Sequence, residues 1–113
     1  MINGGRLRRK IGGNNMNIEN QFIKSLMYLD RNKTNIAKNI LEKTIEITRQ
    51  ENNQLYYIKI NTVLGELYFN EENNIKAKEY LLEALNTKYE EDDVLNYEKG
   101  KCKELLNEIN NKK

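Results

Sequence analysis

The feature that most constrains the fold of this chain is an apolar pattern that recurs after 40 residues. Within each copy the apolar residues recur at steps of three and four, which predicts helices and not strands. Two helices per copy, joined by a short polar segment, make a helical hairpin that is used twice and must stack to bury its apolar faces. The aligned pairs are Ser25 with Gly65, Tyr28 with Tyr68, Leu29 with Phe69, Ala37 with Ala77, Leu41 with Leu81, Thr44 with Ala84, and Ile45 with Leu85.

Small residues stand where the two helices of each hairpin should meet. Ser25 and Gly65 occupy equivalent positions in the first helix of each copy, and Ala37 and Ala77 do so in the second. A small side chain lets the backbone of a facing helix approach closely, so we expect these four positions to lie in the seams between helices.

The whole chain is predicted to be all-α, with about five helices forming two antiparallel hairpins and a C-terminal capping helix. No segment alternates apolar and polar residues long enough to be a strand. The predicted repeats are about 17–50 and 55–88, and the capping helix is about 93–111. The extra length of the repeat is expected within 46–57, in longer helices or in a longer linker.

The second copy resembles the tetratricopeptide repeat family. Residues 64–68 read Leu-Gly-Glu-Leu-Tyr, and Ala77, Leu81, Ala84 and Leu85 follow at the family's spacing. The first copy matches less closely because Lys24, Ser25 and Thr44 replace the leucine, glycine and alanine. The proline that often closes such a repeat is missing, and the period is 40 where about 34 is usual. The longer repeats resemble those of bacterial peptide-sensing regulators.

The resemblance implies that function lies on a concave face lined by the first helix of each pair. Apolar and polar side chains mix there, as in a groove that takes a peptide. The alternative is that two hairpins form only a shallow groove and that its apolar residues contact a neighbouring chain or helix. The implied inward positions are Lys59, Thr62, Glu66, Phe69 and Asn70, and, in the first helix, Glu19, Phe22, Leu26, Leu29 and Asp30.

The residues that most enzymes and metal sites need are missing. The chain has no histidine and one cysteine, Cys102, which we expect to be a small buried residue. Ser25 is the single serine, so triad chemistry is excluded. The carboxylate run 90–93 lacks the spacing and the glycine of a calcium loop and instead suits a helix start. We therefore expect no enzyme activity, no cofactor and no metal.

The positive charge of the chain is concentrated in residues 1–15, a predicted flexible basic tail or leader that precedes the helical domain 16–113. Its bases are Arg6, Arg8, Arg9 and Lys10, and it holds no acid. Four charges would bind nucleic acid only weakly, and the nearly neutral remainder lacks a dense cationic face. The opening 4–8 resembles that of bacterial repressor-type helix-turn-helix domains, but no recognition helix follows.

The sequence favours a protein- or peptide-binding adaptor or regulatory module. No stretch of about 18 apolar residues could span a membrane, so a cytoplasmic location is expected. One alternative is the sensor portion, or a truncated relative, of a peptide-responsive transcription regulator. Another is a structural protein that self-associates through its exposed hairpin ends.

Overall fold

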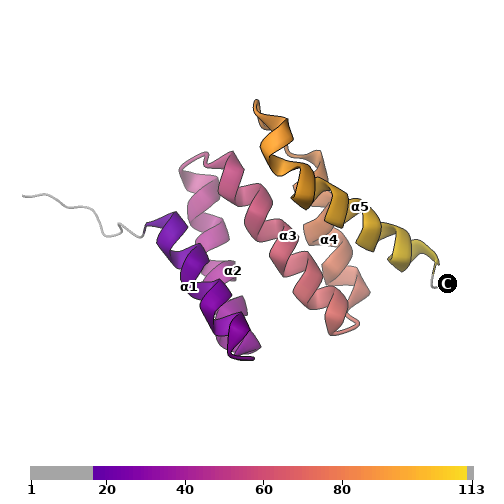
Figure 1. The fold of residues 1–113 in the computed structure, drawn as a ribbon, viewed down its shortest axis with the longest axis horizontal. Helices are drawn as coiled ribbons and strands as arrows, with labels where there is room; N and C mark the ends of the chain where they lie inside the picture. The colour runs from indigo at the N-terminus through magenta and orange to yellow at the C-terminus, as the bar shows by residue number, and fades with distance from the viewer. Residues whose placement is uncertain (1–16, 112–113) are drawn as a thin grey trace, which may run out of the picture.

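A computed structural model describes residues 17–111, and this part of the chain is all-α, as predicted. Five α-helices follow one another, with a single turn of 3-10 helix at Asp92–Leu95 before the last. No strand occurs within 17–111. The helices are α1 (Ile18–Asp30), α2 (Thr34–Gln50), α3 (Gln54–Asn70), α4 (Asn74–Asn86) and α5 (Asn96–Asn111) (Figure 1).

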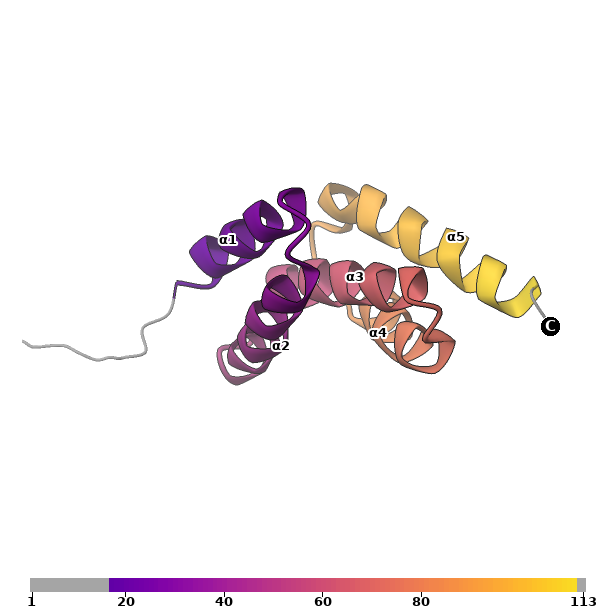
Figure 2. The same ribbon diagram turned by 90° about the horizontal axis from the view of Figure 1, so that it is seen from below.

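The helices pack as two hairpins with α3 at the centre. α1 packs on α2 and α3 packs on α4, while α2 and α5 also contact α3. Figure 2 shows that α1 and α5 lie on one side of α3, and that α2 and α4 lie on the other. The body is elongated, with extents of 62 × 33 × 20 Å.

The three linkers that join α1, α2, α3 and α4 are each three residues long and reverse the chain in the same way. The middle residues, Asn32, Asn52 and Glu72, have left-handed φ values of 61°, 55° and 63°. The residue after each donates its N–H to a carbonyl five positions earlier, as Asn73 N does to Tyr68 O at 2.9 Å. This is the Schellman arrangement, which satisfies the last carbonyls of a helix and turns the chain back. Asn32 therefore makes this turn, and no side chain caps the start of α2.

The extra length of the repeat lies in the helices. α2 and α3 have 17 residues each, whereas α1 and α4 have 13 each. The added turns meet at the linker 51–53, which stays as short as the linkers within the hairpins. The prediction that the extra residues fall within 46–57 is confirmed.

Gly65 allows α3 and α4 to come into close contact. A Cβ atom added at Gly65 would lie 2.5 Å from Leu81 Cδ2 and 2.7 Å from Leu81 Cγ. Leu81 is fully buried and has little room to move. In the first hairpin, Ser25 is buried at the equivalent position, and its hydroxyl donates to Phe22 O at 2.6 Å. The predicted packing role of these small residues is confirmed.

A lysine from α5 closes the end of α4. Lys99 Nζ donates to Ala84 O and Leu85 O, each at 3.1 Å, and to Thr87 O at 2.9 Å. These carbonyls belong to the last turn of α4 and the residue after it, where no further helical N–H can reach them. The cation also suits the negative end of the helix dipole. α5 itself begins at Asn96, three residues later than predicted, after the fully buried Leu95.

Candidate functional site

Two of the predicted inward positions on α3 are covered by α5. Lys59 Nζ forms an ion pair with Glu98 Oε2 at 2.9 Å. Thr62 is 3% exposed, donates to Ile58 O, and lies 3.4 Å from the sulfur of Cys102. Thr62 is therefore part of the seam between α3 and α5 and is not open to a peptide. The capping helix packs over the N-terminal half of the face that the sequence assigned to ligand binding.

One turn from Lys59 on α3, Tyr56 lies close to two predicted positions of α1, Phe22 and Glu19. Phe22 packs edge-on to this ring, with centroids 5.5 Å apart. Burial raises the pKa of the Tyr56 hydroxyl above its usual value, and the nearby carboxylate of Glu19 raises the pKa further. These contacts anchor α1 to α3, so Phe22 and Glu19 join the two hairpins. The sequence pattern did not identify Tyr56 as a contact between the two hairpins.

The remaining predicted positions differ in their exposure. Glu66 and Phe69 are half-buried, and Phe69 packs against the core. Asn70, at the last residue of α3, is exposed. Leu26 on α1 is 38% exposed although it is a large apolar side chain. Of the ten predicted inward positions, Leu26 is thus the apolar one that the described fold leaves most open.

Leu26 belongs to a larger apolar surface, here called the α1 face, which consists of Ile23, Leu26 and Met27. Ile23 is 47% exposed and Met27 is 50% exposed. The three residues are spaced i, i+3, i+4 and so adjoin one another on the helix surface. The opposite side of α1 holds the buried Ile18 and Ser25. Six apolar residues in 18–29 span too wide an arc for one helix contact, so part of this set stays at the surface.

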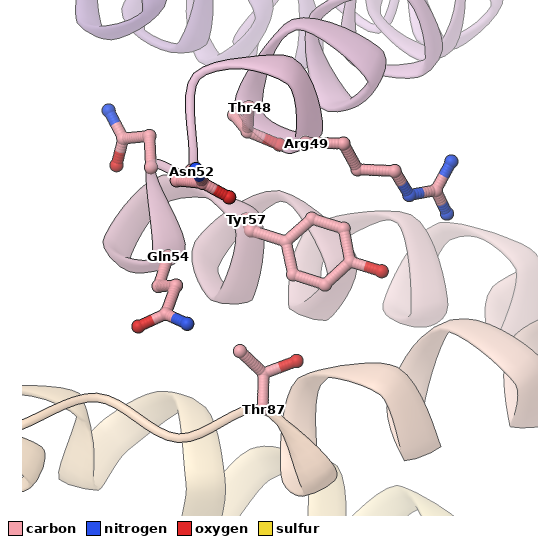
Figure 3. Close-up of a pocket in the computed structure, with 7 residues that line it drawn as sticks. Thr48, Arg49, Asn52, Gln54, Tyr57 and Thr87 are labelled. Atoms are coloured by element: carbon pink, nitrogen blue, oxygen red, sulfur yellow. The ribbon is translucent and has the colours of Figure 1, made fainter.

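The opposite side of the molecule is hollowed between α2 and α4. One cavity of about 210 Å³ is lined by Thr48, Arg49, Asn52, Asn53, Gln54, Tyr57 and Thr87. Figure 3 shows the Tyr57 ring of α3 projecting between Arg49 at the end of α2 and Thr87 after α4. A second cavity, of about 570 Å³, also includes Arg49 and lies further along α4. No local sequence pattern indicates either cavity, because residues from three different parts of the chain line each of them.

A cluster of polar and aromatic groups joins α2, α3 and α4 beside these cavities. Tyr68 donates to Glu42 Oε2 at 2.6 Å, and its ring stacks on Tyr80 with centroids 5.6 Å apart. Burial first, and then the hydrogen bond to Glu42, raises the pKa of the Tyr68 hydroxyl. Lys38 forms an ion pair with Glu71 at 2.8 Å, and its Nζ lies 4.6 Å from the Tyr68 ring centroid. These contacts join α2 of the first hairpin to α3 of the second.

The described part of the chain offers no arrangement typical of catalysis or metal binding. Cys102 is fully buried, and burial raises the pKa of its thiol, so the nucleophilic thiolate is disfavoured. The Ser25 hydroxyl is buried and bonded within its own helix. Within residues 17–111, no group of three or more His, Cys, Asp or Glu residues could hold a metal ion.

The basic residues Arg6, Arg8, Arg9 and Lys10 lie outside the described residues. Within 17–111, no helix is long and apolar enough to cross a membrane. No protein-family model, no curated protein and no solved structure matches this chain.

Proposed function

We propose that this chain is a non-enzymatic protein-binding module of tetratricopeptide-like construction, which takes its partner on the α1 face. The observation that carries the proposal is the exposure of Ile23, Leu26 and Met27, which is between 38% and 50% for each side chain. A contiguous set of large apolar side chains on a surface is typical of a protein–protein contact. Because the other side of α1 is already buried against its neighbours, the helix can present this face without unfolding.

Three further features support a binding role. Leu26 is also one of the inward positions that the repeat resemblance implies. Arg31 and Lys24 flank a small cavity of about 160 Å³ beside Met27 and Tyr28, which gives the apolar face a polar, basic rim. Apolar centres with polar rims are the usual anatomy of interfaces. The buried states of Ser25 and Cys102 leave neither as an accessible nucleophile.

The experiment is an affinity capture with the full chain, compared with a Leu26→Glu, Met27→Glu double variant. Ile75→Glu is the matched control, because Ile75 is 77% exposed at the start of α4 and lies outside the α1 face. We expect a partner to be retained by the parent and by the control and lost by the double variant. If the double variant keeps every captured protein at moderate salt, the α1 face is not the binding surface.

A second candidate is self-association through the same face. At the other end of the molecule, α5 buries its apolar residues Cys102, Leu105, Leu106 and Ile109 within the fold. Two copies would therefore pair through their α1 faces, and a two-fold pair would close without further growth. Sedimentation of the parent and the double variant over a range of concentrations tests this candidate. A monomer mass for the parent at every concentration would exclude it.

A further inference from the structure

We propose that the groove between α2 and α4 binds a lysine or arginine side chain from a basic peptide segment. This α2–α4 groove has a volume of about 570 Å³, within the range of about 300–1,000 Å³ that is common for ligand sites. α2 and α4 lie on the side of α3 away from α1 and α5 (Figure 2), and no residue of the α1 face lines the groove. Its lining residues are Arg49, Asn61, Glu79, Tyr80, Leu82, Glu83 and Asn86.

One residue that lines the groove has an unsatisfied hydrogen-bond acceptor. Asn61 is 1% exposed, and its Nδ2 donates to Tyr57 O at 2.8 Å. Its Oδ1 is buried and has no hydrogen-bond partner in the structure. A buried amide oxygen without a donor is unfavourable, and native proteins rarely leave one so. Asn61 also lines the groove, so a donor group that enters deeply enough to reach Oδ1 would remove this penalty.

The α2–α4 groove also carries unpaired negative charge. Glu79 and Glu83 stand one turn apart on α4 and both line the groove. Glu83 accepts from the Tyr57 hydroxyl, whereas Glu79 has no ion-pair partner within residues 17–111. The cation of the groove, Arg49, is already paired with Glu46 and lies over the Tyr57 ring, 5.5 Å from its centroid. The remaining charge is negative, which favours a cationic ligand.

One side of the groove is lined by an aromatic ring. Tyr80 is half-buried, lines the groove and stacks on Tyr68. The Tyr68 ring already attracts two ammonium groups, because Lys38 Nζ and Lys76 Nζ lie 4.6 Å and 5.1 Å from its centroid. An aromatic face, two carboxylates and an amide oxygen match the donors of an ammonium or guanidinium group.

The direct test titrates a blocked Gly-Gly-Lys-Gly-Gly peptide into the isotope-labelled full chain and follows the Asn61 side-chain amide by NMR. Two comparison peptides carry norleucine, which keeps the length without the charge, or glutamate in place of lysine. We expect a saturable shift of the Asn61 amide with the lysine peptide and none with the other two. Equal shifts with norleucine, a response to glutamate, or no response at Asn61 would each overturn the proposal.

Variants locate the site. Glu79→Gln removes one acceptor charge without disturbing a described ion pair, and we expect the dissociation constant to rise at least threefold. Glu108→Gln, the same change at an exposed residue of α5, should leave the constant unchanged. Asn61→Leu removes the amide oxygen and should also weaken binding at least threefold. If Glu79→Gln and Glu108→Gln have equal effects, the peptide binds elsewhere and the proposal is wrong.

Discussion

The two hairpins place one residue pattern in two different environments. α3 of the second hairpin packs against α4, α2 and α5 and also touches α1, whereas α1 of the first hairpin packs mainly on α2. Tyr68 on α3 is 8% exposed and is held by Glu42, Lys38 and Tyr80. Its counterpart Tyr28 lines a shallow cavity at the edge of the molecule.

This contrast shows that a repeated sequence fixes the helices but not how completely each one is covered. Val63 and Leu67 of α3, the counterparts of Ile23 and Met27, are half-buried and pack against the core. Ile23 and Met27 are each about half exposed because no helix among residues 17–111 lies outside α1. An apolar side chain becomes part of a candidate binding surface when no other helix covers it. Four substitutions, each compared with a control, test whether the two hairpins differ in their contributions to stability.

The largest effect is expected at the seam of the second hairpin. Gly65→Leu must push Leu81 out of a fully packed site and should lower the free energy of unfolding by about 3 kcal/mol. Urea denaturation measures the change. Ser25→Ala, at the equivalent position of the first hairpin, is the control and should change stability by about 0.5 kcal/mol or less. Similar midpoints for Gly65→Leu and the parent would contradict the close approach of α3 and α4.

The next effect concerns how α2 and α4 end. α2 ends in a left-handed turn at Asn52, whereas α4 ends in the extended residue Thr87 and depends on Lys99. Lys99→Met keeps most of the apolar stem and removes the ammonium, so we expect a loss of about 1.5–2 kcal/mol, since hydrogen bonds to charged groups are the stronger kind. Lys103→Met, at an exposed position of the same helix, should be nearly neutral. Equal thermal midpoints for the two variants would show that Lys99 does not hold the end of α4.

A smaller effect separates the two equivalent tyrosines. Tyr68→Phe removes the hydroxyl bonded to Glu42 and should destabilise the protein by about 1 kcal/mol. Tyr28→Phe should change the free energy of unfolding by less than about 0.3 kcal/mol, which is typical of a peripheral site. Urea denaturation of both variants at neutral pH measures the difference. If the two losses are equal, the polar cluster between the hairpins adds no stability.

The smallest expected effect is a gain in stability at the turn of the second hairpin. Glu72 has φ = 63°, a conformation that glycine adopts without steric cost and that asparagine tolerates better than glutamate. Glu72→Gly should stabilise the protein by about 0.5 kcal/mol after the added freedom of the unfolded chain is counted. Asn32→Gly, at the equivalent turn of the first hairpin, should gain less. A clear loss in Glu72→Gly would show that its side chain makes a favourable contact.

Much of the fold could be predicted from the sequence. The five helices, the pairing of α1 with α2 and of α3 with α4, the close approach at Gly65 and the place of the extra turns all follow from local spacing. The exposure of the predicted inward positions was predicted less well. Leu26 is exposed as expected, but Thr62 is buried under α5, and Phe22 and Glu19 serve to join α1 to α3.

The sequence by itself determined which residues share a face of each helix, because the 3.6-residue period is a property of the local backbone. The tertiary structure alone decided which of those faces are covered. Cys102 meets Thr62, Lys99 reaches the end of α4, and Asn61 lines a groove between helices, all across separations of 12 to 40 residues or across three helices. Such contacts depend on how whole helices compete to bury their apolar surfaces, and no short stretch of sequence encodes that competition.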